Sequence, residues 1–526
     1  MKNFLEKHQE LIIGILNGFD RLIIQGTLRH LAHTGGMIDF LYRMGVLLKN
    51  FGSYVEQMTM MLKEASVQEA NRLNRPIVYL PTSGEDKGEI AREIMNEDKI
   101  DKGLICILKS VDPCLSYKVH RNKQKKKLDL KREWRKCLHL YHYWIDEEFG
   151  FTGASIQTWF PFNIKVFLNG REWLARKLKK AGIAYTKSDN CFLSIEDMAR
   201  AQELMKQQLT LNWVATMDKI ALRLNPAFKK MFAKYKIPYY WTMFESEWAT
   251  DIMFKSSRSL ASIYPQLVRG AMSTFSSPDV MRFLGGKTFH GNFKGEVVSD
   301  YKKRPEGIRI KHRVNKNWLK MYDKKGCILR LETTMNNPRD FRVYHSKPKE
   351  SQLRDKDEKK KPKWRKMNKG VSDIYHRAQA SQASNERYIE ALDGLDTDIP
   401  IKDLVEPICL PVKWKGKRVR DMRPWKKEDV ELLLVIRRGE FCTNGFRNKN
   451  LVQILYPEID AFATEKERKK AAARCTRKIR LLRAHGLIRK KPNSYRYVVS
   501  KKGNEIIPAI LGYRECTLRK LYKEAA

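Results

Sequence analysis

Alternating polar and apolar residues between positions 311 and 337 predict two short β-strands. The first strand, Trp318–Lys324, presents three polar residues on one face, namely Lys320, Tyr322 and Lys324. A Lys-Lys-Gly corner follows, and the second strand, Cys327–Met335, places Glu332 on one of its faces. If the two strands pair as a hairpin, we expect Tyr322 to lie near Glu332.

This hairpin has two interpretations. A phenol flanked by ammonium groups is a candidate nucleophile for a phosphodiester, whose negative oxygens Lys320 and Lys324 would neutralise while Glu332 holds a metal ion. The alternative is an ordinary solvated strand face, because polar outer faces are common in antiparallel sheets.

The charge of the chain favours a polyanionic partner. The sequence has 526 residues, 103 of them Lys or Arg and 60 Asp or Glu, and a formal net charge of +43. Such an excess is far larger than solubility requires and is typical of nucleic-acid binding, with DNA expected and structured RNA as an alternative. The apolar run Leu11–Leu28 is interrupted by Asn17, Asp20 and Arg21, so no membrane partner is expected.

Length and cysteine content indicate a large intracellular protein. A hydrophobic content of 42% is sufficient for about three domains with real cores. The nine cysteines include no close CxxC pair, which suits a reducing compartment. We therefore predict a cytoplasmic, nucleoid-associated protein, and the sequence does not determine its oligomeric state.

The predicted fold class is α+β and multidomain. It comprises an N-terminal α/β unit (1–168), a central antiparallel-sheet core (169–345) and a C-terminal winged helix (427–526). In the N-terminal unit, strands alternate with helices. The predicted elements are strands at Phe19–Gly26, Ile77–Leu80 and Gly103–Leu108, and helices at Tyr54–Leu73 and Glu85–Met95.

A basic run at positions 118–136 contains eleven basic residues, counting His120. An aromatic cluster follows it, made of Tyr141, Tyr143, Trp144 and Trp159. Lysines can hold a backbone and aromatic rings can stack on bases, which favours single-stranded or structured nucleic acid; a solvated helix followed by core aromatics is the alternative. The candidate binding residues are Lys118, Arg121, Lys123, Lys125, Lys126, Lys127, Arg132 and Arg135.

The same region offers a weaker metal motif. Cys137, His139 and His142 could contribute to a zinc site with Cys114 or His120, although residues in an aromatic run are more often packing residues.

The central region begins with helical patterns. Helices are predicted at Gly170–Ala181 and Ile195–Gln208, with a short hairpin near Asp189 between them. Ser194, with Asp197 three residues later, resembles an N-terminal capping box.

An acidic segment follows at Tyr239–Phe254. On a strand, Glu245, Glu247 and Asp251 share one face, and on a helix Glu247 and Asp251 do. Either geometry lets two carboxylates converge, as a hard cation such as Mg²⁺ or Mn²⁺ requires; surface exposure is the alternative.

These segments carry a family resemblance. The acidic E-W-A-T-D, the basic K-M-Y-D-K about seventy residues later and the following L-R-L-E-T together resemble the catalytic core of plasmid rolling-circle replication initiators of the Rep_trans type, over about residues 237–345. The resemblance implies that Glu247 and Asp251 bind a divalent metal with Glu332 as a further acidic partner, that Tyr322 attacks DNA and that Lys324 clamps a phosphate. The family usually has Asp where this chain has Glu247. Over its full length the chain resembles an uncharacterised bacterial family labelled as winged-helix regulators.

The C-terminal third contains a connector and a winged-helix pattern. A flexible basic linker is predicted at 346–370, followed by a helix and connector at 371–426 with one amphipathic helix at Val371–Leu392. Helices at Glu428–Arg437, Asn444–Leu455 and Glu465–His485 then precede two alternating arms around a Pro-Asn-Ser turn.

In the last of these helices, Cys475, Ile479 and Leu482 form an inward stripe. The basic residues of this helix and of the wing suit a DNA groove and its phosphates. They are Arg474, Arg477, Lys478, Arg480, Lys490, Lys491 and Arg496. A basic three-helix packing module is the alternative.

Three functions follow from these patterns. The first is a metal-dependent DNA nicking and strand-transfer enzyme of a mobile or replicating element that uses Tyr322. The second is a non-catalytic DNA- or RNA-binding regulator or ribonucleoprotein component. The third is a carboxylate-metal nuclease that uses water in place of Tyr322.

Overall fold

A computed structural model of the chain shows a mixed α+β fold with one large sheet, several two-stranded sheets and many helices. This confirms the predicted fold class. It describes residues 1–526 except 125, 274, 276, 286–294, 306, 346–362, 394–400, 437–440, 442–444, 460–462, 492–493 and 515–526. The chain forms two compact units. Unit 1 contains Met1–Gln9, Ala261–Asn315 and Glu386–Ala526, and unit 2 contains Glu10–Leu260 and Lys316–Asn385.

Unit 2 is built on a sheet to which it contributes nine strands, in the order β12-β13-β9-β1-β6-β5-β4-β3-β2. Their bounds are β1 (Ile12–Thr27), β2 (Ile77–Leu80), β3 (Gly103–Asn122), β4 (Lys127–Asp146), β5 (Gly150–Gln157), β6 (Ile164–Asn169), β9 (Tyr240–Phe254), β12 (Asn317–Lys324) and β13 (Ile328–Met335). The strands predicted from alternation are therefore present, and the acidic segment is a strand. Strands from the predicted N-terminal and central regions belong to this one sheet.

The predicted α/β alternation is limited to one crossover. Strands β2 and β3 pair in parallel around helix α4 (Lys87–Glu97), whereas β1 pairs antiparallel with both β6 and β9. The predicted first helix is also present, as α3 (Phe51–Arg72).

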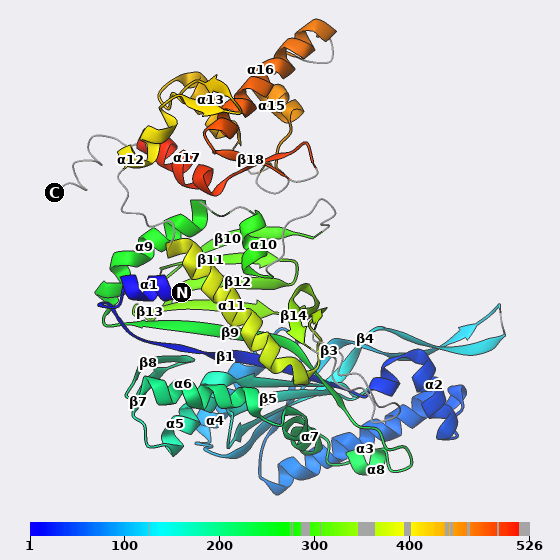
Figure 1. The fold of residues 1–526 in the computed structure, drawn as a ribbon. Coiled ribbons are helices and arrows are strands. Elements are labelled where there is room, and N and C mark those ends of the chain that lie inside the picture. Colours follow the sequence, from blue (N-terminus) through cyan, green and yellow to red (C-terminus); the bar gives the residue numbers. More distant parts are fainter. Residues whose placement is uncertain are drawn as a thin grey trace, which may run out of the picture. The chain divides into compact units, whose positions relative to one another are not determined.

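Helices cover both faces of the β1–β9–β13 region (Figure 1). On one face lie α5 (Gly170–Lys180), the hairpin β7–β8 (Tyr185–Ser188 and Cys191–Ile195) and α6 (Met198–Lys206). The contact is close, since a Cβ on Gly18 of β1 would lie 2.2 Å from the side chain of Met205. Asp197, not Ser194, caps α6, because Ser194 belongs to β8 and the Asp197 side chain accepts the amide hydrogen of Arg200.

The other face is held by polar side chains of helix α11 (Ile374–Asp393), which confirms the helix predicted there. Asn385 donates to the backbone oxygen of Leu331 at 3.1 Å and to the hydroxyl of Thr250 at 3.1 Å. Buried Arg377 donates to the backbone oxygen of Met243 at 2.8 Å. These contacts fix β9 and β13 from behind and leave the α5–α6 face for the site described below.

Further helices complete unit 2. They are η1 (Arg29–Ala32), α2 (Thr34–Arg43), η2 (Leu48–Asn50), η3 (Gln207–Thr210), α7 (Trp213–Leu224), α8 (Phe228–Met231), η4 (Pro338–Asp340) and η5 (Val371–Asp373). The structure differs from the predicted linker at its C-terminal end. Strand β15 (Lys363–Lys366) pairs with β14 (Arg342–His345), and Met367 is buried, while residues 346–362 lie outside the described residues.

The basic run does not form a helix. Strands β3 and β4 continue through it as a long antiparallel hairpin, with register pairs from Gly103–Ile145 to Asn122–Lys127. Two of the four aromatic residues predicted to stack on bases, Tyr143 and Trp144, lie in the core instead, while Tyr141, whose hydroxyl donates to Asp112 at 2.8 Å, and Trp159 are partly buried. Trp134, which the sequence did not single out, is 72% exposed.

Outside its C-terminal domain, unit 1 contains α1 (Lys2–Lys7), most of α9 (Ser257–Ser273), α10 (Ser277–Phe283) and the hairpin β10–β11 (Val297–Arg304 and Gly307–Val314). His312 of β11 is buried and lies between the hydroxyls of Ser299 and Tyr388, at 2.7 and 3.1 Å.

The C-terminal domain has the order of elements predicted for a winged helix. It contains α12 (Ile401–Val405), η6 (Glu406–Ile408), the β16–β17 hairpin (Val412–Trp414 and Lys417–Val419), α13 (Lys427–Ile436), α15 (Asn448–Leu455), α16 (Glu465–Ala484), the β18–β19 hairpin (Ile488–Lys490 and Tyr497–Val499) and α17 (Lys501–Arg514). The inward stripe of α16 is confirmed, since Cys475, Ile479 and Leu482 are buried.

One helix of this domain begins later than predicted. Residues 445–447 cannot join α15, because Phe446 exchanges two backbone hydrogen bonds with Tyr497 of the wing, at 2.8 and 2.9 Å. This bridge adds a third strand position to the wing hairpin.

Candidate metal centre beside a tyrosine

Four neighbouring strands of unit 2 bring the predicted site residues onto one face. Lys320 of β12 lies opposite Glu332 of β13, and Tyr322 lies opposite Arg330. Arg330 in turn lies opposite Asp251 of β9. Since side chains alternate along a strand, these register pairs place Lys320, Tyr322, Glu332 and Asp251 on the same side of the sheet.

Three carboxylates on this face converge. Asp20, Glu247 and Glu332 each offer one oxygen, and these oxygens lie within 4.8 Å of one another. All three side chains are buried. Within the described residues this is the one group of His, Cys, Asp and Glu side chains placed to hold a metal ion, so Cys137, His139 and His142 form no such group.

Asp20 belongs to this cluster, although the sequence pattern indicated only that it interrupts an apolar run. The pairing of β1 with β9 shifts register between Phe19 and Arg21, which is a β-bulge. The bulge lets Asp20 and Arg21 both reach the site, and Arg21 donates to Glu247 at 3.0 Å and to Glu245 at 2.6 Å.

Asp251 is placed differently from the other predicted metal ligands. Its two oxygens accept hydrogen bonds from the Arg330 guanidinium at 2.5 and 2.8 Å, and Arg171 of α5 lies 2.9 Å from one of them. Burial alone would raise the pKa of Asp251, but Arg330 and Arg171 lower it below its usual value. Both oxygens of Asp251 are therefore occupied by arginine.

Arg330 joins the acidic residues to the neighbouring hairpin. Besides Asp251, it donates to Asp20 at 3.0 Å and to the backbone oxygen of Asn190 at 2.8 Å, in the β7–β8 turn. The Asn190 side chain donates to Asp20 at 2.6 Å. Both of these contacts to Asp20 fall on the same oxygen, Oδ2.

Tyr322 contacts the carboxylate cluster directly. Its hydroxyl donates to Glu332 at 2.8 Å, and the other oxygen of Glu332 accepts from Lys320 at 2.6 Å. Burial, and then the charge of Glu332, raise the pKa of Tyr322 well above its usual value, so the phenol is protonated at neutral pH.

Lys324 lies at the far end of the same strand face. Its ammonium group donates to the Asn190 side chain, and burial followed by the charge of Arg330 lowers its pKa. Because the Asn190 side chain is a neutral amide, this contact does not neutralise the positive charge of Lys324.

Two of the clustered carboxylates differ in protonation. Burial, and then repulsion from Glu332, raise the pKa of Glu247 to about 7. Burial would also raise the pKa of Glu332, but Lys320 lowers it below its usual value. At pH 7 Glu247 is therefore about half protonated while Glu332 is ionised, and a bound cation would displace the proton on Glu247.

We predict that the contribution of Glu247 to the stability of the metal-free protein falls as pH rises. The pKa of Glu247 is about 7 in the folded chain and 4.5 as its ordinary value. At this side chain the folded state thus binds more protons between these values, so its contribution falls from about pH 4.5 to 7 and then levels off. Buried His142 and His312 contribute in the opposite direction over much of this range, because burial lowers their pKa values to about 4. This group should contribute a loss of about 1–3 kcal/mol.

Urea unfolding in EDTA at pH 5, 6, 7 and 8 would measure this loss. Compared with the wild-type chain, Glu247→Gln should gain unfolding free energy between pH 5 and 8, whereas Glu245→Gln, at the Arg21 end of the same strand, should keep the wild-type pH dependence. An unchanged profile in Glu247→Gln would contradict the assignment.

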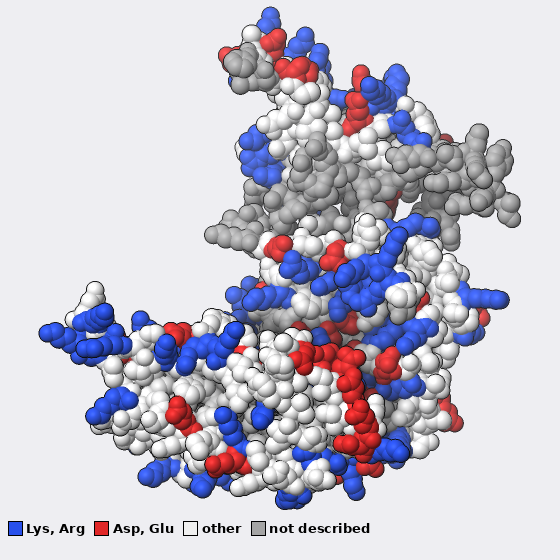
Figure 2. Space-filling model, turned by 180° about the vertical axis from the view of Figure 1, so that it is seen from behind, with Lys and Arg blue, Asp and Glu red and all other residues white. Residues whose placement is uncertain are grey.

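The predicted nucleic-acid contacts of the basic run lie on the β3–β4 hairpin, where Figure 2 shows basic side chains gathered on the projecting arm. Most of them are exposed, namely Lys118, Arg121, Lys123, Lys126, Lys127 and Arg132. Arg132 and Arg135 also donate to the backbone, at Ala32 and Tyr117 respectively. Lys125 lies outside the described residues.

The predicted contacts of the winged helix lie on α16 and the wing. Arg474 and Arg477 are exposed, while Lys478 and Arg480 are partly buried. At the wing, Lys490 lies over the ring of Tyr495, at 5.5 Å from its centre, and that ring is 82% exposed. Lys491 is partly buried, and Arg496 donates to the backbone oxygen of Gly445 at 3.2 Å.

Comparison with known proteins gives no relative. No family model, curated protein or solved structure matches the chain. Within the described part of the chain, every helix is too short or too polar to cross a bilayer.

Proposed function

We propose that the protein is a metal-dependent nicking and strand-transfer enzyme of a mobile or replicating element, with DNA as its substrate and Tyr322 as its nucleophile. One observation carries this proposal: the Tyr322 hydroxyl donates to Glu332, which is also a member of the buried carboxylate cluster with Asp20 and Glu247. A nucleophile and its proton acceptor thus lie beside a group of oxygens suited to a hard cation.

The donor set fits Mg²⁺ or Mn²⁺. Hard divalent cations bind oxygen at about 2.0–2.6 Å, so ligands on opposite sides are about 4–5 Å apart. The three oxygens lie within 4.8 Å of one another. Asp20, Glu247 and Glu332 would therefore hold the ion, in place of the predicted set with Asp251. A bound divalent cation would polarise the phosphodiester and offset the charge of the carboxylates.

The residues of the chain would carry the transfer. Glu332 accepts the phenolic proton of Tyr322 as the phenolic oxygen attacks phosphorus. A bond from that oxygen to phosphorus forms, one ester bond of the phosphodiester breaks, and the departing oxygen takes a proton from solvent. Lys320 and Lys324 hold the non-bridging oxygens of the phosphate. Resealing reverses these steps with a new hydroxyl.

Substrate binding would draw on the basic surfaces described above. The winged helix places Arg474 and Arg477 at exposed positions of α16, suited to the major groove, and its wing adds Lys490. The affinity should fall steeply with salt, because neutralised phosphates release counterions.

A second candidate is a nuclease that uses the same carboxylates and a water nucleophile. The raised pKa of Tyr322 favours it, because a phenol that holds its proton tightly is a weaker nucleophile unless Glu332 removes that proton. This nuclease would need the cation but not Tyr322.

Covalent capture tests the proposal. A labelled single-stranded oligonucleotide with Mn²⁺ should give a protein–DNA adduct that survives denaturing electrophoresis. Tyr322→Phe should reduce the adduct at least about 1,000-fold, because the attacking oxygen is gone. Tyr240→Phe removes a hydroxyl from a half-exposed tyrosine of β9 and should leave the adduct unchanged.

Each outcome selects one function. Persistence of the adduct in Tyr322→Phe would exclude this nucleophile. Cleavage without any adduct, abolished by EDTA, would identify the water-dependent nuclease. Binding that is insensitive to both EDTA and Tyr322→Phe, with no cleavage, would identify a non-catalytic DNA- or RNA-binding protein.

A further inference from the structure

The β3–β4 hairpin includes a two-stranded ribbon that no other strand joins. Strand β2 pairs with β3 only through Ser110, and β5 pairs with β4 only from His139. Residues 111–122 and 127–138 therefore pair with each other alone. Twelve residues at about 3.4 Å each make a ribbon about 40 Å long, which extends past the rest of the sheet in Figure 1.

The base of this ribbon is fixed. The buried Tyr117 hydroxyl donates to the backbone oxygen of Leu31 at 2.8 Å, and Arg132 donates to that of Ala32 at 2.6 Å. Trp159 donates to the backbone oxygen of Tyr117 at 3.0 Å. Leu130 and Val119, which are register partners, still pack on the main core, so the part of the ribbon that projects runs from Arg121 to Leu128.

The ribbon carries an excess of positive charge. From Lys118 to Lys136 the sequence has ten Lys or Arg residues and two acidic residues, a net charge of +8. The two acidic side chains are already engaged, since Glu133 contacts His120 at 3.0 Å and Asp129 accepts from Asn122 at 2.7 Å.

Two lysines oppose each other in this ribbon. Lys118 and Lys131 are register partners, both are exposed, and neither has an acidic partner within the described residues. Like charges directly opposite each other destabilise a strand pair. A phosphate between them would turn this repulsion into attraction.

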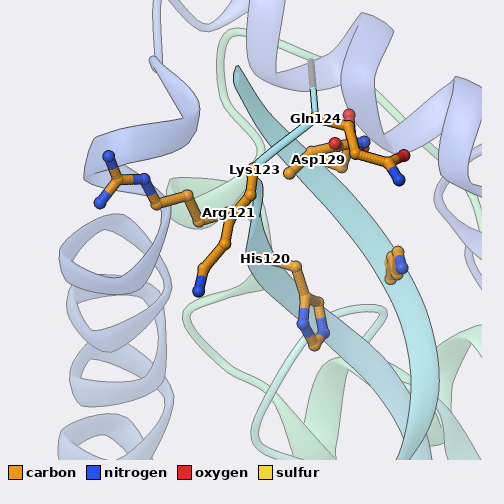
Figure 3. Close-up of a pocket in the computed structure, with 7 residues that line it drawn as sticks. His120, Arg121, Lys123, Gln124 and Asp129 are labelled. Atoms are coloured by element: carbon orange, nitrogen blue, oxygen red, sulfur yellow. The ribbon is translucent and has the colours of Figure 1, made fainter. Parts of the chain in front are cut away.

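A hollow of about 360 Å³ lies at the tip, next to this lysine pair. Its lining comes from both strands and from the turn, including His120, Lys123 and Asp129 (Figure 3). Lys131 also lines it. The hollow widens the surface on which an anionic backbone could rest.

We propose that the ribbon binds duplex DNA by lying in the major groove, with Lys118 and Lys131 on a phosphate. The major groove is about 12 Å wide and admits a two-stranded ribbon, whereas the major groove of an RNA duplex is too narrow for side chains to read. Stacking on single strands is not favoured, because Tyr143 and Trp144 are buried in the core and Trp134 is the one exposed aromatic ring among the described residues of the ribbon, whereas successive bases need a series of rings. The inference rests on the proposed function and names the form of DNA that this surface holds.

Binding of labelled duplex DNA, its separate strands and a matched RNA duplex to the full chain tests the inference. For Lys118→Ala/Lys131→Ala, we expect duplex-DNA affinity to fall roughly tenfold near physiological salt, with the slope against log salt smaller by about 2, as for two lost phosphate contacts. Lys229→Ala/Lys230→Ala removes two exposed lysines of α8 and serves as the matched control. It should change neither quantity.

Dimethyl sulfate reports which groove is occupied, because it methylates guanine N7 in the major groove and adenine N3 in the minor groove. The wild-type chain should protect guanine N7, and the ribbon variant should lose this protection. Protection of adenine N3 alone, equal losses for duplex and single strands, or equal binding of the RNA duplex would overturn the inference.

The ribbon variant also separates this inference from the proposed function. With a short single strand at saturating concentration it should still form the Tyr322 adduct, because the contacts of Tyr322 with Glu332 do not involve the ribbon. If the adduct is absent from every variant but guanine protection depends on Lys118 and Lys131, the nicking proposal fails and the groove contact stands.

Discussion

Replacing Arg330 with methionine is expected to lower the free energy of unfolding by about 3–5 kcal/mol, the cost of removing one partner from a buried ion pair. Arg330 is fully buried and donates to Asp251, Asp20 and the backbone of Asn190. Burial alone would lower its pKa, but Asp251 and Asp20 raise it well above its usual value. Methionine fills a similar volume but would leave two buried carboxylates facing each other with less compensation.

Urea unfolding followed by circular dichroism would measure this change. Arg200→Met is the control, because Arg200 is half-exposed on α6 and its pair with Glu203 is solvated, so a change below about 1 kcal/mol is expected. Adding Asp251→Leu to Arg330→Met should recover part of the loss, since it removes one uncompensated charge. A loss below 1 kcal/mol for Arg330→Met would show that these ion pairs do not hold the sheet to the β7–β8 hairpin.

The sequence predicted local elements well because their signals are local. Alternation between Trp318 and Met335 predicts which side chains share a face, and the structure has Tyr322 and Glu332 in hydrogen-bond contact. The three helices and wing of the C-terminal domain follow from apolar spacing and a turn in the same way. The fold class and helix α11 could be predicted from the sequence for the same reason.

The composition of the carboxylate cluster could not be predicted from these signals. Glu247 and Asp251 share a strand face, so periodicity treats them alike, yet only Asp251 lies opposite Arg330. Asp20 is more than two hundred residues away from either and reaches the cluster through a β-bulge. Both facts depend on the register between distant strands, which no local pattern records.

The sequence also does not show which parts of a basic and aromatic segment are buried. A basic run followed by aromatics is compatible with a binding surface or with a strand entering a core, and composition does not separate them. The β3–β4 hairpin has an exposed basic part and a part that enters the core, since Trp144 is buried and Trp134 is exposed on the same strand. Whether a residue of β3 or β4 is buried depends on whether β2 or β5 pairs beside it. That pairing is set by the sheet and cannot be read from the basic run itself.

Asp20→Asn is expected to weaken Mn²⁺ binding about 100-fold at pH 8, because one of three anionic ligands is replaced by a neutral amide of the same size. Asp251→Asn should change the affinity less than about tenfold, because its oxygens face Arg330 and Arg171 and not the cluster. The two substitutions are chemically identical, so their difference isolates the position of the carboxylate. Calorimetric titration with Mn²⁺ of each folded variant would measure it.

The free energy of unfolding should rank the two variants in the opposite order to Mn²⁺ affinity, with Asp251→Asn the more strongly affected. Asp251→Asn leaves the fully buried Arg330 and Arg171 with less negative charge, whereas Asp20→Asn keeps the Arg330–Asp251 pair intact. We therefore expect Asp251→Asn to unfold at lower urea concentration and Asp20→Asn to lose the Tyr322 adduct while remaining folded. Loss of Mn²⁺ affinity in Asp251→Asn, with wild-type affinity in Asp20→Asn, would favour the ligand set predicted from sequence. Retained affinity in Asp20→Asn would exclude the cluster as the metal centre, since Glu247 and Glu332 alone would then suffice.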